Sequence, residues 1–173
     1  MTESPKKIAV VAYGEDIGNR HVSQYDHVIA VNRASGAVFA EYTVCADHEA
    51  VHTFVPLNAQ TVFVSDTYNA TKIRQDNHLP QWRIVSLEPP GDITASIFIA
   101  IWFAANHLAA REIDVYGARW SGRTDADGYC DENHRRSTSR WDKERRQFEE
   151  TCKKLRPRGI VLRRVLLEDL SLE

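Results

Sequence analysis

The stretch from Thr94 to Arg119, TASIFIAIWFAANHLAAREIDVYGAR, decides the fold of this chain. Two hydroxyl residues open it, and an apolar run with helical spacing follows. A β-branched segment then ends in Val-Tyr-Gly. This order predicts a helix over 94–110 and a strand over 112–116, which together form the second half of a βαβ unit.

Short segments rich in β-branched residues recur through the rest of the chain, with helical patterns between them. The predicted strands are 7–12, 27–32, 42–46, 61–65, 83–87, 112–116 and 160–165. The predicted helices are 17–25, 47–54, 69–74, 94–110 and 139–155. Several strands are continuous apolar runs, as in strands buried on both faces. We therefore expect an α/β fold: a single Rossmann-like three-layer domain over residues 1–173 with a mainly parallel sheet.

Size and charge set limits on the partners. The chain has 173 residues, of which 43% are hydrophobic and 27% charged, with a net charge of −2. No overall attraction to nucleic acid follows from that balance, so a nucleic-acid partner is not expected. The longest apolar run, 97–105, is too short to span a bilayer, and the N-terminus has no apolar signal region. These features predict a cytoplasmic protein without a membrane partner, and they leave the oligomeric state open.

Neither the cysteines nor the histidines predict a metal site. The three cysteines are far apart and form no CxxC pair, which argues against zinc and against a disulfide framework. Residues His48 to His52 read HEAVH and match the HExxH pattern of zinc proteases. The string begins directly after a predicted strand, however, rather than inside a long active-site helix. We therefore expect no metal ligands.

Polar residues follow the predicted strands at the edge where open α/β sheets bind ligands. Asn19 lies in the glycine-containing turn after the first strand, which is either a ligand contact or part of a plain tight turn. Asn32 and Arg33 end the second strand and offer an amide and a fork-shaped cation to a ligand. The alternative is that Asn32 caps a helix and Arg33 is solvated.

Three further positions are candidates for the same edge. Asp47 follows the third strand, where it either contacts a ligand or caps the next helix. Thr94 and Ser96 open the late helix, whose unpaired N–H groups suit a phosphate. The long polar segment 120–137 holds His134 beside Arg135. There, a histidine can transfer a proton and an arginine can balance a leaving phosphate, unless the segment is only a surface loop.

Taken in order, these motifs resemble those of a known group. The motifs are the first glycine/asparagine turn, VNRA at the end of the second strand, Ala-Asp after the third, and Thr-Ala-Ser opening a helix that leads into EIDVYG. The pattern looks like a Rossmann-like group that includes bacterial lipooligosaccharide-type sialyltransferases and archaeal 6-hydroxymethylpterin diphosphokinase-like proteins. Small phage-encoded relatives are similar too.

The resemblance implies roles for particular residues. Asn19 and Asn32 would contact the nucleotide, and Thr94 and Ser96 the nucleotide or sugar. His134 would act as the base.

On this reading the chain is a nucleotide- or nucleotide-sugar-dependent transferase, for glycosyl or diphosphate transfer. Arg33 and Arg135 would add donor contacts, and Asp47 would be a further polar contact at the catalytic site. Mg²⁺ would suit diphosphate transfer. The alternative is a non-catalytic protein, phage-encoded or not, that binds a nucleotide or a partner protein through the same pocket. The sequence leaves open whether the protein is an enzyme.

Overall fold

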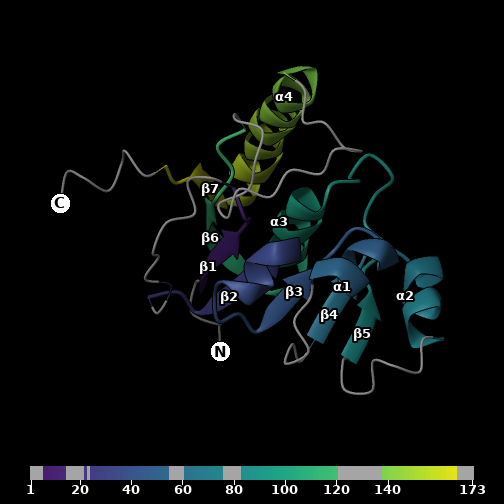
Figure 1. Cartoon of the computed structure of the whole chain (residues 1–173). Coiled ribbons are helices and arrows are strands. Elements are labelled where there is room, and N and C mark those ends of the chain that lie inside the picture. The colour runs from purple at the N-terminus through teal and green to yellow at the C-terminus, as the bar shows by residue number, and fades with distance from the viewer. Residues whose placement is uncertain are drawn as a thin grey trace.

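The structure, a computed structural model, describes residues 6–14, 22, 24–54, 61–75, 83–120 and 138–166. Its centre is one seven-stranded sheet in the order β5-β4-β3-β2-β1-β6-β7 (Figure 1). The strands are β1 (Lys6–Val11), β2 (His27–Val31), β3 (Tyr42–Val44), β4 (Thr61–Val64), β5 (Arg83–Ser86), β6 (Ala110–Tyr116) and β7 (Val161–Arg164). Every neighbouring pair is parallel.

The sheet confirms the predicted α/β class. Each predicted strand is present, with ends that differ by no more than two residues. β1 lies between β2 and β6 and is parallel to both. Strands this short and apolar are recognisable locally because both of their faces are covered.

Four α-helices and two short 3₁₀ helices connect the described strands. The α-helices are α1 (His48–Phe54), α2 (Thr67–Arg74), α3 (Ser96–His107) and α4 (Thr138–Leu155). The 3₁₀ helices are η1 (Asn32–Gly36) and η3 (Arg156–Arg158). The predicted helix over 17–25 falls mostly outside the described residues. Within the part of the chain that the structure describes, no helix is long and apolar enough to cross a bilayer.

α3 is shorter than the predicted 94–110 at both ends. It begins at Ser96, with Ala95 as its N-cap, and Leu108 is its C-cap. Ala110 already belongs to β6, where it pairs with Lys6 of β1. The apolar, helix-favouring sequence therefore gives way to strand pairing at its end, because tertiary pairing overrides local helix propensity.

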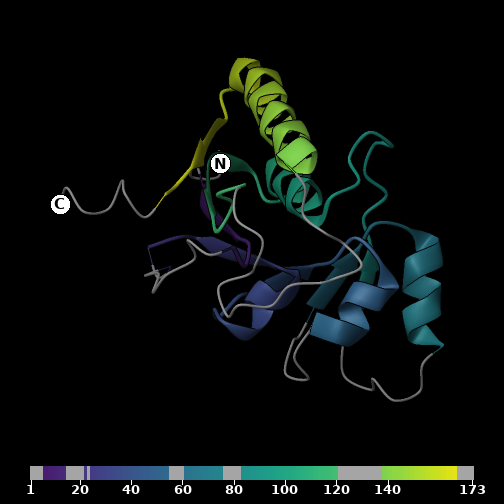
Figure 2. The same cartoon turned by 45° about the horizontal axis from the view of Figure 1, so that its top comes forward.

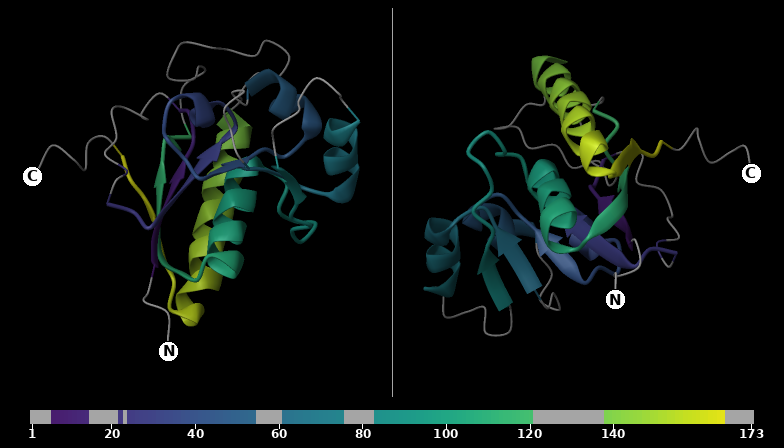
Figure 3. Two further views of the ribbon diagram at one scale, coloured as in Figure 1. Left: turned by 90° about the horizontal axis from the view of Figure 1, so that it is seen from below. Right: turned by 180° about the vertical axis from the view of Figure 1, so that it is seen from behind.

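α3 and α4 cover one face of the sheet, and Figures 2 and 3 show the two helices side by side. α3 is apolar on nearly all sides, as expected for a helix in the centre of a core. Ile8 and Val10 of β1 and Ile113 of β6 point into this core, and all three are fully buried. α4 adds the buried Leu155 and the partly buried side chains of Trp141, Phe148 and Cys152.

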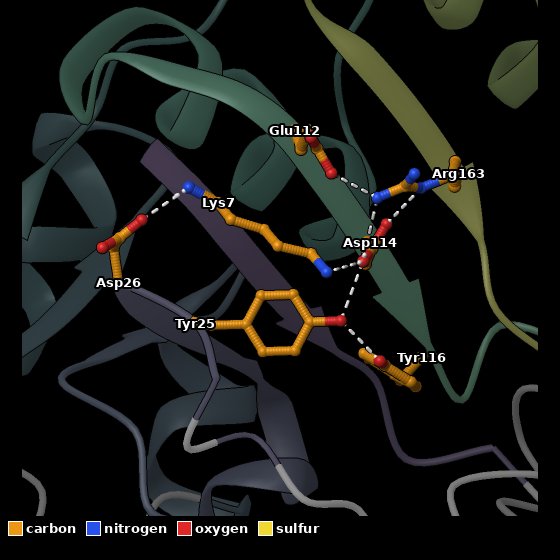
Figure 4. Close-up of polar contacts among 7 residues, drawn as sticks. All are labelled: Lys7, Tyr25, Asp26, Glu112, Asp114, Tyr116 and Arg163. Atoms are coloured by element: carbon orange, nitrogen blue, oxygen red, sulfur yellow. Dashed lines mark hydrogen bonds and ion pairs between the residues drawn. The ribbon is translucent and has the colours of Figure 1, made fainter. Parts of the chain in front are cut away.

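The opposite face has two parts. α1 and α2 cover β3, β4 and β5, where Val51 and Ile73 pack on Val62 and Val64. Over β1, β2 and β6 lies a second apolar cluster that includes Ala9, Val11 and Ala30. A group of polar side chains adjoins it over β1, β6 and β7 (Figure 4). Its centre is Asp114, which is 4% exposed.

Side chains from three parts of the chain form hydrogen bonds or ion pairs with the Asp114 carboxylate. Tyr25 Oη donates to it at 2.8 Å, Arg163 Nε donates at 2.7 Å, and Lys7 Nζ lies 3.5 Å away. Tyr25 also bonds the hydroxyl of Tyr116 at 2.5 Å. Because the carboxylate is well supplied with donors, the cluster ties β1, β6, β7 and the turn before β2 together, and we assign it a structural role.

Candidate functional site

The strand order places a topological switch beside β1. β1 to β5 run outward to one edge of the sheet, and the chain then crosses back to lay β6 on the other side of β1. Ligands of open α/β sheets bind outside the carboxyl ends of the strands at such a reversal. The carboxyl ends of β1 and β6, with those of β2 and β3 beside them, therefore form the edge on which to look for a site.

The chain segments after β1 and β6 stay joined beyond the strands. Ala12 N donates to Tyr116 O at 2.9 Å, and Gly14 N donates to Gly117 O at 3.0 Å. Gly117 has φ +66, and a Cβ there would lie 2.0 Å from Ala12 O. Only glycine permits this approach. A ligand at the switch point would thus lie above these bonds rather than between the two strands.

Asn32, at the end of β2, and Ser96, at the start of α3, meet at this edge. Ser96 Oγ accepts the N–H of Ala46 at 2.7 Å and donates to Asn32 Oδ1 at 3.2 Å. Ser96 is only 8% exposed, so one buried hydroxyl joins the ends of β2 and β3 to α3. Among the described residues Asn32 Nδ2 has no hydrogen-bond partner. Neither of its two N–H donors is used within the described residues, and such donors suit a ligand that carries oxygen acceptors.

The other predicted contact residues that the structure describes are Thr94, Arg33 and Asp47, and each has a different environment. Thr94 is exposed and precedes the N-cap of α3, so its predicted place in the first helical turn is wrong. The guanidinium of Arg33 lies 5.5 Å from the ring centre of Tyr13, which follows β1. Asp47 Oδ1 accepts the N–H of Ala50 at 2.8 Å, which is the capping alternative.

Asn19, His134 and Arg135 lie outside the described residues. The structure therefore does not test the predicted roles of Asn19 as an amide contact and of His134 as the base.

Backbone strain is concentrated at the same edge. Among the described non-glycine residues, four have a positive φ. Three of them follow strands: Asn32 at +50 after β2, Glu88 at +48 after β5 and Trp120 at +52 after β6. Such conformations cost free energy and persist where the surroundings enforce them, often at binding sites. Their position at one sheet edge supports a functional role for that edge.

Two polar residues at this edge, Glu88 and Asn69, were not predicted from the sequence. Glu88 Oε1 accepts both the N–H and the hydroxyl of Thr67, at 2.6 and 2.7 Å, and so joins the end of β5 to α2. Asn69 is 8% exposed and bonds His48 of α1. For Asn69 the sequence does contain a local signal. Asp66 follows β4 and precedes Asn69 by three residues, which is the spacing of an N-cap and the N–H that it accepts.

Two ionisable groups at the edge have shifted pKa values. The backbone N–H of Asn69 is the main cause that lowers the pKa of Asp66, and the Ser65 hydroxyl adds to it. Burial and, to a smaller extent, the charge of Asp47 raise the pKa of the Cys45 thiol to about 12. Cys45 is thus a protonated core residue and not a nucleophile.

The described residues contain no preformed metal site. Mg²⁺ is usually held by one or two carboxylates together with waters and substrate phosphates. Within the described ranges, no group of three or more His, Cys, Asp or Glu side chains is placed to hold a metal ion. Asp47, Asp66 and Glu88 instead accept hydrogen bonds from the first turns of helices. We therefore derive no step through a metal.

Comparison with known proteins adds no assignment to this geometry. No protein-family model, no curated protein and no solved structure matches the chain.

Proposed function

We propose that this chain binds a nucleotide or nucleotide sugar at the carboxyl edge of β1, β2 and β3 and uses it as the donor in a transfer reaction. The ligand would lie over Asn32, with Ser96 beneath the amide. The resemblance in the sequence motifs supplies the reaction class, and the geometry of the edge supports the ligand class.

One observation carries the proposal: the side-chain amide of Asn32 is fixed by its oxygen, and none of the described residues accepts from its two N–H donors. Ser96 holds Oδ1 from below, and the left-handed backbone of Asn32 is retained at a cost in free energy. A nucleotide offers base, ribose and phosphate acceptors to such an amide. The N-cap of η1 is Val31 and makes no side-chain capping bond, so the Asn32 amide does not serve as the helix cap.

Transfer also needs a group that moves a proton or balances the leaving group. The resemblance assigns the first role to His134 and suggests Arg33 and Arg135 for the second. The competing function is nucleotide or partner binding without turnover.

The test begins with a thermal-shift screen of the full chain against nucleoside mono- and diphosphates and nucleotide sugars. The best ligand is then titrated calorimetrically into wild type and Asn32→Asp. Asp keeps the oxygen that faces Ser96 but replaces the donor group with a second, negatively charged oxygen. We expect at least tenfold weaker binding, about 1.4 kcal/mol.

The matched control is Asn106→Asp at the other end of α3, where the amide oxygen already accepts from Arg158. It should bind like wild type. Equal binding by Asn32→Asp and wild type would contradict the site, and a screen without any binder would contradict the proposed function. Tight binding without turnover of any nucleotide sugar would favour the competing function, in which the protein binds a nucleotide but catalyses no transfer.

A further inference from the structure

A second side chain at the carboxyl edge is held in one defined orientation. His48 is the first residue of α1 and lies two positions after Ala46, whose N–H bonds Ser96. Its backbone N–H and its ring Nδ1 both contact Asn69 Oδ1, at 2.9 and 3.0 Å. The contacts with Asn69 therefore hold the imidazole on the sheet edge that also carries Asn32 and Ser96.

The chemistry of its neighbours determines which way the Asn69 amide faces. Asn69 Nδ2 lies 3.0 Å from the carboxylate oxygen Oδ1 of Asp66 and 3.2 Å from Ser65 Oγ. A carboxylate only accepts hydrogen bonds, so the NH₂ group must face Asp66. The reversed amide would set its oxygen against the carboxylate and its NH₂ against the His48 backbone N–H. Asn69 Oδ1 consequently faces His48.

This orientation fixes the tautomer of the histidine. Asn69 Oδ1 can only accept, so His48 Nδ1 must carry the hydrogen. In the neutral ring the lone pair is then on Nε2, on the far side of the imidazole from Asn69. Among the described residues Nε2 has no hydrogen-bond partner. The ring is partly exposed and meets the edge of Tyr68, itself 63% exposed.

A base held by a third group that fixes its tautomer is the arrangement of catalytic histidines, including those oriented by an asparagine. We infer that His48 is the proton acceptor of the transfer reaction and that Asn69, held by Asp66, is its positioning residue. The inference rests on the proposed function. It gives to His48 the role that the resemblance gives to His134.

The acceptor substrate of this reaction carries a hydroxyl group. The acceptor oxygen forms the new bond to the transferred group, and its O–H bond breaks as the proton passes to His48 Nε2. The bond between the transferred group and the donor phosphate breaks, and the phosphate leaves with the electron pair.

The first experiment measures the tautomer independently of turnover. Long-range ¹H–¹⁵N spectra of protein labelled in histidine are recorded above neutral pH for wild type, His48→Gln and Asn69→Ala. His48→Gln assigns the signal. We expect the Nδ1–H form in wild type and loss of that preference in Asn69→Ala. A wild-type His48 in the Nε2–H form overturns the inference.

The second experiment measures transfer and binding for His48→Ala, His134→Ala and the control His107→Ala. His107 lies at the far end of α3 and stacks on Phe103. We expect His48→Ala to lose at least about hundredfold in kcat while its nucleotide affinity stays within tenfold. His107→Ala should retain wild-type kcat.

The outcomes separate the two proposals. Wild-type turnover that survives His48→Ala overturns the role of His48 and leaves the transferase standing. Binding of nucleotide without any turnover overturns the proton transfer but leaves the site. If Asn69→Ala does not fold, His48→Ala decides alone, because it removes only the Nδ1 contact with Asn69 among the hydrogen bonds described for that ring.

Discussion

Arg163 on β7 donates from Nε to the carboxylate of Asp114 on β6 at 2.7 Å, and this bond fastens the edge strand to the sheet. The carboxylate is 5% exposed, whereas the side chain of Arg163 is 47% exposed. Lys7 of β1 and the hydroxyl of Tyr25 contact the same carboxylate. The buried member is therefore the acidic one, and its removal leaves several donors without their acceptor (Figure 4).

Asp114→Ala should lower the free energy of unfolding by about 3 kcal/mol, because the buried Tyr25 hydroxyl and two cations lose their acceptor. Urea denaturation measures the change. The matched control is Glu112→Ala on the same strand, whose carboxylate pairs with Arg163 but is 45% exposed. Exposed ion pairs contribute little, so we expect less than about 1 kcal/mol. Equal losses in the two variants would contradict the central position of Asp114.

Tyr25 should make stability depend on alkaline pH. Burial, then the hydrogen bonds with Tyr116 and Asp114, raises the pKa of Tyr25 well above the ordinary 10.0. The folded state holds the proton more tightly than the unfolded state. This contribution is complete below pH 10.0 and declines as the pH rises further. Tyr25→Phe should show a smaller loss of stability above that pH, in denaturation curves compared at matched pH values.

The control for that comparison is Tyr68→Phe, because the Tyr68 side chain is 63% exposed. It should keep the wild-type decline. A decline of the same steepness in Tyr25→Phe would show that other groups are responsible.

Gly117→Ala should destabilise the switch point strongly. The added Cβ would lie 2.0 Å from Ala12 O, and φ +66 is unfavourable for alanine. Since the obstacle is backbone, the bonds between the β1 and β6 ends must shift, and we expect a loss above about 3 kcal/mol. Thermal unfolding compares it with Gly91→Ala, where nothing lies within 4 Å of the added atom. That control should change stability by less than about 0.5 kcal/mol.

Asp66→Ala should remove the N-cap of α2 and cost about 1 kcal/mol near neutral pH. The pKa of Asp66 is lowered in the folded state, chiefly by the N–H of Asn69. Its contribution is therefore present above the ordinary aspartate pKa and is lost as the pH falls through the lowered value. Wild type and Asp66→Ala should differ at pH 7 and converge in acid, in urea titrations at both pH values. A constant difference would contradict this linkage.

The sequence by itself determined the α/β class and the mainly parallel sheet. Runs of β-branched residues and an all-round apolar helix carry that information locally, because burial on both faces demands it. The strand ends were correct to within two residues. The sequence also placed Asn32 and Ser96 at one sheet edge, since parallel strands end together.

Tertiary structure alone decided which of these polar groups meet. The hydrogen bond between Ser96 and Asn32 spans 64 residues, and that between His48 and Asn69 spans 21. Such contacts depend on strand order and on the closing of helices against the sheet, which no local pattern encodes. The end of α3 was decided in the same way. Ala110 leaves the helical pattern because β1 offers it a strand partner, and pairing across the sheet outweighs the helix propensity of one alanine.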